Sequence, residues 1–357
     1  MPAIDRLFQL MQQAKGSDLH LAEGQPPKYR VHGHIAPIPN EGVLTHDQLT
    51  AYLQEICPVH HWAKYVKKGD CDFAYAMGAS DRFRANYYKH QRGYGAIFRI
   101  IPTKILTLEQ LNVPKKLYDF CELTSGLVLV TGPTGSGKST TLAGMINEIN
   151  AHKARHILTI EEPVEFVHPP KKSIITQREV GDHTKGFGAA LRAAGREDCD
   201  VILVGEMRDL ETIGLAVSAA EMGVLVFGTL HTNSAAKTID RIVNVFPPGQ
   251  QPMIRGMLAG SLRGVVSQTL CRKKDGQGRA AAQEILVSNI AIAAAIRDGK
   301  IAKLNQLMSA GKGEGMITMD DRLQELIDEG VISGNQAYMK AIDKKRFEQY
   351  EHETDGH

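Results

Sequence analysis

The chain has 357 residues, 43% of them hydrophobic and 23% charged, which is typical of a globular protein with more than one domain. Lysine and arginine total 42 against 40 acids, so a formal net charge of +2 gives no global field favouring nucleic acid or an anionic membrane. The longest nearly apolar stretch, 285–296, is too short to span a bilayer. The five cysteines lie far apart without C-x-x-C spacing, which argues against a zinc site or a disulfide framework. We therefore expect a soluble, intracellular protein.

The first hundred residues contain a hairpin signal. Phe83, Ala85 and Tyr87 alternate with polar residues, which predicts a half-buried strand. Turn residues follow at 91–95, and residues 96–101 predict a second strand that returns antiparallel to the first. Because the surrounding sequence mixes strand and helix patterns, we expect an α+β first domain.

The pattern changes along the chain and suggests domain boundaries. Proline at 102 disfavours helical continuation, so we assign residues 1–102 to the first domain and 103–114 to a linker. Residues 115–283 form the expected second domain. After about Gln283 the pattern reads as helical, so residues 284–357 are expected to be a helical C-terminal region with a charged tail.

The second domain contains short, continuously apolar runs, most of them separated by helix-length segments. These runs are Leu127–Val130, Ile157–Ile160, Val201–Val204 and Val224–Leu230. Continuous apolar strands that alternate with helices are typical of a parallel sheet covered on both faces. The fold class is therefore α/β, with a mostly parallel sheet in the second domain.

A phosphate-binding loop follows the first of these strands and opens a helical stretch. It fits G-x-x-x-x-G-K-[ST] and consists of Gly132, Pro133, Thr134, Gly135, Ser136, Gly137, Lys138, Ser139 and Thr140. The glycines let backbone N–H groups turn toward a phosphate, and the helix N-terminus adds its positive dipole end. Lys138 would reach the β- and γ-phosphates, and Ser139 would ligate Mg²⁺. The sequence thus predicts binding of a nucleoside triphosphate with Mg²⁺.

Polar side chains follow the other strands at the same expected sheet edge. Asp200 and Glu206 flank one strand and stand about 20 Å apart at about 3.3 Å per residue, so only one can approach the phosphates. Parallel sheets bind ligands at the carboxyl ends of their strands, which favours Glu206 as the acid that orders Mg²⁺ or its water. By the same argument His231 follows the next strand, and Glu161, Glu162 and Glu165 follow an earlier one.

Two arginines of the first domain are also candidates. Arg84 and Arg99 are equidistant from a point between residues 91 and 92, so a turn there makes them cross-strand neighbours. Like charges in this position are destabilising unless an anion compensates them. They would either point to water, pair with acids such as Glu122 or Glu109, or clamp a triphosphate.

Long motifs resemble one known family, the type IV pilus retraction (twitching motility) ATPases of the secretion ATPase superfamily. In the second domain these motifs are the phosphate loop, ILTIEEPVEF at 157–166, TQREVG at 176–181, DVILVGEMRDLET at 200–212, FGTLHTNSAAKTIDRI at 227–242 and AIRDGK at 295–300. In the first domain they are SDLHL at 17–21, RFRANYY at 82–88 and FRIIPTKILTLEQL at 98–111. The resemblance covers roughly residues 3–340.

The resemblance implies a hexameric ATP-hydrolysing motor with a PAS-like N-terminal domain and a RecA-like ATPase core. It assigns Lys138 and Ser139 to the Walker A motif and Glu206 to an atypical Walker B motif. It further implies that Glu165 polarises the attacking water, that His231 contacts the γ-phosphate side, and that Arg84 and Arg99 reach nucleotide. AIRDGK matches a helical motif linked to retraction.

The same resemblance implies partners and a location. The motor would be cytoplasmic and peripheral at the inner membrane, acting on a platform protein of the pilus machine, with membrane contact only through partners. The sequence departs from the family pattern at four positions: Val224 replaces a frequent histidine, Glu162 a frequent aspartate, and Gly195 and Cys199 replace leucine and proline. The exchange at Val224 leaves open whether the chain is a principal or an accessory retraction ATPase.

Three alternatives stay open at this point. An assembly-type pilus or type II secretion ATPase typically carries a tetracysteine module and a further N-terminal domain, which do not fit this sequence. A RecA-like nucleic-acid motor should show a basic channel with stacking aromatics, whereas the short basic runs at 171–172 and 272–274 have no such neighbours. No nucleic-acid partner is expected. A scaffold without turnover conflicts with the presence of Glu165, Glu206 and His231.

Overall fold

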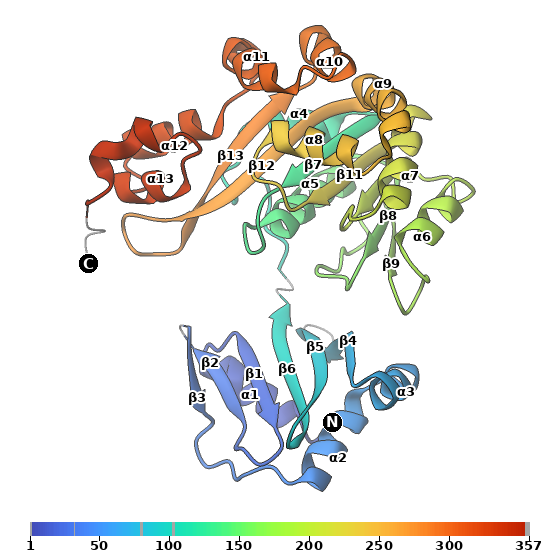
Figure 1. Cartoon of the computed structure of the whole chain (residues 1–357). Helices are drawn as coiled ribbons and strands as arrows, with labels where there is room; N and C mark the ends of the chain where they lie inside the picture. The colour runs from blue at the N-terminus through green and yellow to red at the C-terminus, as the bar shows by residue number, and fades with distance from the viewer. Residues whose placement is uncertain (1, 32, 79–80, 102–103, 354–357) are drawn as a thin grey trace. The chain divides into compact units, whose positions relative to one another are not determined.

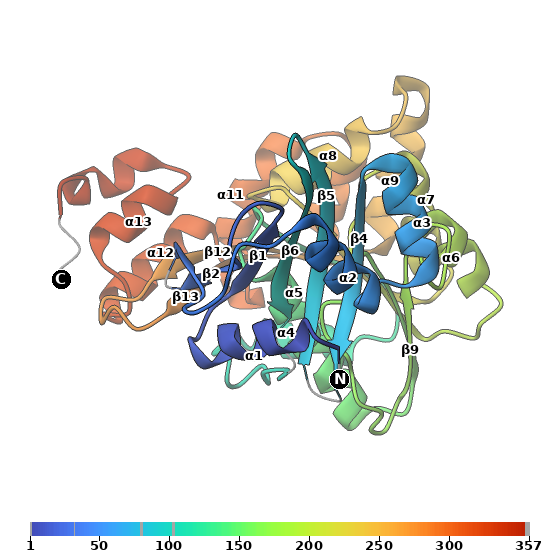
Figure 2. The same ribbon diagram turned by 90° about the horizontal axis from the view of Figure 1, so that it is seen from below.

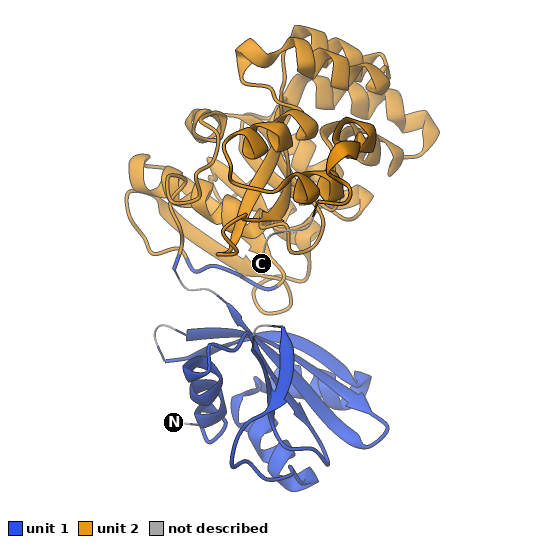
Figure 3. Ribbon diagram, turned by 90° about the vertical axis from the view of Figure 1, so that its left-hand side faces the viewer, with its two compact units in different colours: residues 1–104, 163–167 blue, residues 105–162, 168–357 orange. Residues whose placement is uncertain are grey.

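The computed structural model describes residues 2–31, 33–78, 81–101 and 104–353. These residues form two compact units, coloured blue and orange in Figure 3. The first unit comprises residues 1–104 and 163–167, and the second comprises residues 105–162 and 168–357. The boundary expected at residues 102–103 and the end of the charged tail, residues 354–357, lie outside the described residues.

The first unit is a six-stranded antiparallel sheet with three helices (Figure 1). Its strand order is β3-β2-β1-β6-β5-β4. Its elements are α1 (Asp5–Gln13), β1 (Asp18–Ala22), β2 (Lys28–Val31), β3 (His34–Pro37), α2 (His46–Ile56), α3 (Val59–Lys68), β4 (Asp70–Met77), β5 (Asp81–His90) and β6 (Gly93–Ile101).

Side chains that alternate along β5 and β6 divide the sheet of this unit into an apolar and a charged face. Phe83, Ala85 and Tyr87 are fully buried in one core with apolar residues of all three helices, and Phe8 of α1 stacks on Phe83 with ring centroids 4.2 Å apart. Figure 2 shows α1 running across the direction of β4 and β5. The predicted hairpin is confirmed, because β5 and β6 pair antiparallel around a tight turn between His90 and Gly93.

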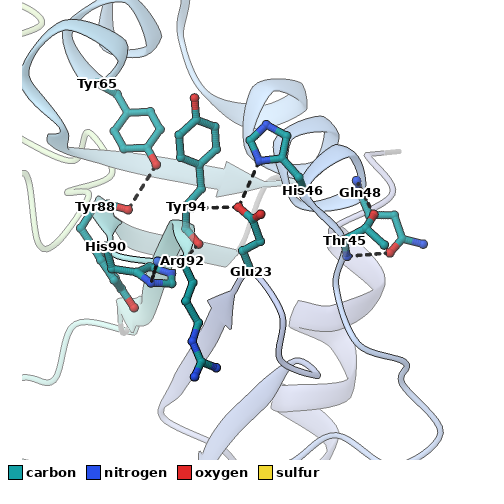
Figure 4. A network of polar contacts seen from close by, with 9 residues as sticks. All are labelled: Glu23, Thr45, His46, Gln48, Tyr65, Tyr88, His90, Arg92 and Tyr94. Carbon is teal, nitrogen blue, oxygen red and sulfur yellow. Dashed lines mark hydrogen bonds and ion pairs between the residues drawn. The ribbon is translucent and has the colours of Figure 1, made fainter.

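A polar network fixes α2 to the sheet of the first unit (Figure 4). Thr45 and Gln48 form a reciprocal capping box that starts α2 at His46. The Glu23 carboxylate accepts a hydrogen bond from the Tyr94 backbone N–H at 3.3 Å and lies 3.0 Å from His46 Nδ1. The hydrogen bond with Glu23 raises the pKa of His46, and the same bond lowers the pKa of Glu23.

The second unit is a seven-stranded sheet in the order β13-β12-β7-β11-β10-β8-β9. All neighbouring strands are parallel except β12 and β13, which are antiparallel. Its strands are β7 (Gly126–Thr131), β8 (His156–Glu161), β9 (Ile174–Glu179), β10 (Val201–Val204), β11 (Leu225–Leu230), β12 (Leu262–Arg272) and β13 (Arg279–Val287). Its α-helices are α4 (Lys116–Glu122), α5 (Lys138–His152), α6 (Phe187–Ala194), α7 (Leu210–Glu221), α8 (Ala235–Asn244), α9 (Gln251–Ser261), α10 (Ile290–Arg297), α11 (Leu304–Ala310), α12 (Met319–Asp328) and α13 (Gly334–Lys340).

Helices cover both faces of this sheet, which explains its continuously apolar strands. Leu127 and Leu129 of β7 join the core on the side of α7, α8 and α9, whereas Val128 and Val130 join the core on the side of α4 and α5. The α/β prediction with a mostly parallel sheet is therefore confirmed.

The C-terminal region differs in part from the expectation. Strand β13 continues to Val287, beyond the expected start of the helical region at residue 284, because it pairs along its whole length with β12. Further on, α12 buries Met319, Leu323 and Leu326 and is followed by Gly330 with φ of +70°. No helix in the described part of the chain has the length and apolar character needed to cross a membrane.

Candidate functional site

The phosphate loop connects β7 to α5 at the carboxyl edge of the parallel strands. Gly132, Gly135 and Gly137 all have positive φ values, of +147°, +78° and +85°. A Cβ atom on Gly132 would lie 2.2 Å from the backbone oxygen of Gln268, so only glycine fits there. The loop thus holds a turn that brings its N–H groups and the first turn of α5 to one concave edge.

Two side chains of the loop are arranged to receive an anion. Lys138 Nζ donates to the backbone oxygens of Gly132 and Pro133 at 2.8 and 3.1 Å, so its ammonium group lies over the loop. The Ser136 hydroxyl is buried and has no hydrogen-bond partner among the described residues. These features fit a bound polyphosphate, whose oxygens would accept from both groups.

Glu206 and His231 meet at the same sheet edge. Glu206 follows β10, His231 follows β11, and His231 Nε2 lies 3.1 Å from Glu206 Oε1. Arg208 holds the same carboxylate through Nε and Nη2, each at 2.6 Å. Burial opposes ionisation of Glu206, but the hydrogen bond and charge of Arg208, together with His231, lower its pKa below the ordinary 4.5. Glu206 is therefore an oriented acceptor, and carboxylate oxygens are ligands that Mg²⁺ prefers.

The opposite sheet edge holds residues that do not belong to this site. Asp200 Oδ2 accepts from the His156 backbone N–H at 2.8 Å, beside the amino end of β10. Val224 precedes β11 at the same edge, where its backbone oxygen accepts from Gly126 N–H at 3.0 Å. The choice of Glu206 over Asp200 agrees with this geometry.

The three glutamates after β8 are in different surroundings. Glu161 accepts hydrogen bonds from the Thr159 hydroxyl at 2.7 Å and the Gln177 amide at 3.3 Å. Glu162 is exposed and lies 3.9 Å from Arg208. Glu165 is exposed and lies in the segment 163–167, which belongs to the first unit, so its part in the site is a proposal.

Arg84 and Arg99 lie on the charged face of the first unit's sheet. They are directly paired across β5 and β6. Arg99 Nε lies 2.8 Å from Asp18 Oδ1, and Arg84 Nε lies 3.8 Å from Asp72 Oδ1. The acids proposed from the sequence, Glu122 and Glu109, are thus not the partners shown by the structure.

A cavity of about 570 Å³ lies beside the phosphate loop within the second unit. One wall is formed by residues of the loop and the first turn of α5. The others come from the segment before α4, the ends of β12 and β13, and α12. The lining residues include Leu106, Leu111, Thr140, Leu270, Arg322 and Leu326.

The sequence did not reveal one bracing side chain, Gln268 of β12. Its amide donates to the Ser136 backbone oxygen at 2.6 Å and accepts from the Thr141 hydroxyl at 2.8 Å. Gln283 of the neighbouring strand donates to the same amide oxygen at 2.7 Å. A strand assignment for residues 262–272 would have placed a buried amide next to the loop, but the polar residues obscured that strand.

Comparisons with known proteins point in one direction. The family model described as type II/IV secretion system protein matches residues 84–351. The "Type IV pilus retractation ATPase PilT" of Pseudomonas aeruginosa is 49% identical over 338 residues, or 95% of this chain and 98% of that protein. A "Twitching motility protein" of Neisseria gonorrhoeae is 49% identical over 315 residues, or 88% of this chain and 84% of that protein.

A solved structure is similar over nearly the whole chain. The crystal structure described as "the Pilus Retraction Motor PilT and Bound ADP" matches with a TM-score of 0.90 and 42% sequence identity. The match covers 98% of this chain and 99% of that one. Both the antiparallel unit and the unit with the phosphate loop are therefore included in the similarity.

Proposed function

Because the chain belongs to the type II/IV secretion system protein family and is an ATPase of the pilus retraction type, we propose that it converts ATP hydrolysis into retraction of type IV pili. The observation that supports this most directly is the meeting of Lys138, Glu206 and His231 at one sheet edge. Phosphoryl transfer requires positioning and charge neutralisation beyond mere binding, and a lysine, an acid that can order a metal ion and a histidine at one edge supply groups for both.

The proposed chemistry is hydrolysis of the γ-phosphoryl bond to give ADP and phosphate. Backbone N–H groups of the loop and Lys138 bind the phosphates, and His231 stands toward the γ-phosphate side. Glu165 orients the attacking water and accepts its proton. Mg²⁺, held by Ser139 and Glu206, would neutralise charge on the phosphate oxygens. Arg84 and Arg99 add positive charge to the transferring group.

The cavity beside the loop is the proposed seat of the nucleobase and ribose. Its lining includes Thr140 of the phosphate loop and the apolar side chains of Leu106, Leu111, Leu270 and Leu326. A flat aromatic base is well suited to such walls. ATP would therefore extend from the phosphate loop into a space that the second unit alone provides.

The assembly is a homo-hexamer in this proposal. A heterologous interface generates a ring when its rotation closes, and a ring lets domain movements pass from one nucleotide site to the next. The partner is an inner-membrane platform protein of the pilus machine. The motor would act from the cytoplasm, peripheral at the inner membrane and bound through that partner.

The test combines activity with motility. We expect the purified chain to release phosphate from Mg-ATP and to have the mass of a hexamer in native mass spectrometry. Its rate of phosphate release should not change when DNA or RNA is added. Expression in a strain that lacks its retraction ATPase should restore pilus retraction. Stimulation by nucleic acid would favour a nucleic-acid motor, and ATP binding without turnover would favour a scaffold. No restoration in that strain, combined with stronger retraction when the chain is expressed beside the resident ATPase, would favour an accessory role.

A further inference from the structure

A buried carboxylate on β13 connects two helices of the second unit. Glu284 is 1% exposed. Its Oε1 accepts from the backbone N–H of Ala235 at 2.6 Å, and its Oε2 accepts from the backbone N–H of Met319 at 3.2 Å. Ala235 and Met319 are the first residues of α8 and α12, so one side chain binds the N-termini of two helices.

The two helices supply what a buried anion needs. The first N–H groups of a helix have no partner within the helix and carry the positive end of its dipole. Ser234 and Thr318 cap α8 and α12 by accepting from the third N–H of each, so they leave the first N–H to Glu284. Burial raises the pKa of Glu284, and the two backbone hydrogen bonds oppose that rise.

On one side Glu284 is linked through the sheet register to the edge that carries the phosphate loop. Thr131 of β7, Ser267 of β12 and Glu284 of β13 lie in register across three neighbouring strands. The Thr131 hydroxyl is 2.9 Å from that of Ser267 and accepts from Thr238 of α8 at 3.4 Å. This buried polar row therefore lies directly beneath the start of α8. Because α8 begins four residues after His231, Glu284 fixes the far end of the loop that carries His231.

On the other side Glu284 is connected to the cavity. Ile285 and Ile317 exchange backbone hydrogen bonds at 2.9 and 3.0 Å, so the residues just before α12 are joined to β13. Arg322 and Leu326 of α12 line the cavity beside the phosphate loop. The first N–H of α12, held by Glu284, therefore sets the position of one cavity wall.

We propose that Glu284 is a positioning residue that holds the His231 loop and the α12 wall of the cavity in one fixed arrangement. This inference rests on the proposed function of the same site. A carboxylate can accept from two N–H groups at once, whereas a glutamine amide offers only one acceptor atom and places an N–H₂ group against the second donor. The arrangement thus depends on the acid itself rather than on its shape.

Three variants test the two hydrogen bonds separately. Glu284→Gln keeps the size of the side chain but can accept only one of the two backbone hydrogen bonds. Ala235→Pro and Met319→Pro each remove one N–H at the first helical position, where proline is tolerated. Met319→Ala, which keeps the N–H, is the control for the buried Met319 side chain that the second substitution also removes. The preceding residues, Ser234 and Thr318, already have extended backbones with ψ of 157° and 158°, which a following proline favours.

The readouts are kcat and KM for Mg-ATP, with melting temperature as a check on folding. We expect Ala235→Pro to lower kcat about tenfold with KM within about twofold, because it releases the His231 loop. We expect Met319→Pro to raise KM about fivefold with kcat within about twofold, because it releases the cavity wall. Glu284→Gln should show both changes, and adding Ala235→Pro to it should lower kcat little further.

The outcomes separate this inference from the proposed function. A wild-type chain without ATPase activity would remove the proposed function. An active wild type with an equally active Glu284→Gln variant would overturn the positioning role. So would two proline variants that fold but change the same parameter to the same extent, since Glu284 would then serve packing alone. If Glu284→Gln fails to fold, the two proline variants still test the positioning role, because one should change kcat and the other KM.

Discussion

Arg84 and Arg99 lie directly opposite each other on β5 and β6, and Asp18 compensates the charge of Arg99 from the next strand. Asp18 is in register with Arg99 and is also 3.9 Å from Arg30, so the row contains three arginines and one buried aspartate. Burial opposes ionisation of Asp18, but hydrogen bonds from Ser17 and Arg99 lower its pKa. With Asp72 3.8 Å from Arg84, two carboxylates face three arginines, which leaves this exposed basic row with capacity for a further anion.

We predict that Arg99→Ala and Arg84→Ala fold normally but hydrolyse ATP at least about 100-fold more slowly, since arginines that contact a transferring phosphoryl group contribute this much or more. The measurement is steady-state phosphate release, with the melting temperature as a control for folding. Both side chains are largely exposed, with 70% of Arg99 and 47% of Arg84 accessible, so little packing is lost. Full activity of Arg99→Ala would remove it from the site.

A mixing experiment asks whether the arginine acts within its own subunit. Chains carrying Arg99→Ala are combined with chains carrying Lys138→Ala, each inactive alone. If the contact crosses a subunit interface, mixed rings regain some activity, because an interface can pair an intact loop with an intact arginine. Properly formed mixed rings without activity would place the contact within one subunit.

Glu165→Gln should bind ATP and form rings but lose at least about 99% of turnover, because the amide keeps the shape of the acid and cannot accept a proton from water. Binding of a fluorescent ATP analogue and native mass spectrometry measure the retained properties. Glu162→Gln is the matched control, and we expect it to keep most of the activity. Near-normal turnover of Glu165→Gln would move the base to Glu161 or Glu162.

Much of the fold and of the phosphate site could be predicted, because the signals are local. Three strands are continuous apolar runs: one precedes the phosphate loop, one precedes Glu206 and one precedes His231. The expectation that Glu206 and His231 share a sheet edge agrees with the 3.1 Å between Glu206 Oε1 and His231 Nε2. The family and the α/β class are confirmed by the comparisons. The domain boundaries and the roles of the individual site residues stay predictions.

Other features could not be predicted from the sequence, because they depend on contacts between residues that lie far apart along the chain. Strands β12 and β13 were missed since Gln268, Gln283 and Glu284 interrupt their apolar patterns and residues 280–282 are alanines, which favour helix. Each of those polar residues is satisfied only by partners on other elements. The partner of Arg99, Asp18, lies 81 residues earlier and is brought beside it by the sheet register.

The lowered pKa of Glu206 makes a prediction about stability and pH. Its folded-state pKa lies below the ordinary 4.5, so its ionised form stabilises the fold above about pH 4.5. This stabilisation is lost as the pH falls through the lowered pKa. The melting temperature of wild type should therefore exceed that of Glu206→Gln at pH 7, and the difference should shrink on acidification. A difference that does not change between pH 7 and pH 3 would contradict the assigned contacts of the Glu206 carboxylate with Arg208 and His231.

Arg297→Ala should abolish pilus retraction while ATP hydrolysis stays within about threefold of wild type. Arg297 ends α10, and Asp298 just after it forms an ion pair with Lys300 at 2.9 Å, away from the phosphate loop in the sequence and outside its hydrogen-bond network. The family resemblance of this segment, rather than local chemistry, carries the expectation. Lys303→Ala, at an exposed lysine beyond the motif, serves as the control and should retain retraction. Retraction that survives while hydrolysis collapses would show the assignment to be wrong.

Val224→His restores the residue frequent in the family and tests whether the exchange affects turnover. Val224 stands before the first residue of β11 and His231 after the last, and a strand of six residues spans about 20 Å at about 3.3 Å per residue. The Val224 side chain is half-buried and packs against the core, so histidine there should lower the melting temperature slightly. Because the phosphate loop, Glu206 and His231 all lie at the other edge, we expect kcat and KM for Mg-ATP to stay within about twofold of wild type.

The control is His231→Ala, which should lower kcat at least about tenfold with an unchanged fold. A Val224→His variant with unchanged melting temperature and a tenfold change in kcat would mean that the far edge of the sheet influences hydrolysis, and would make position 224 a determinant of motor speed.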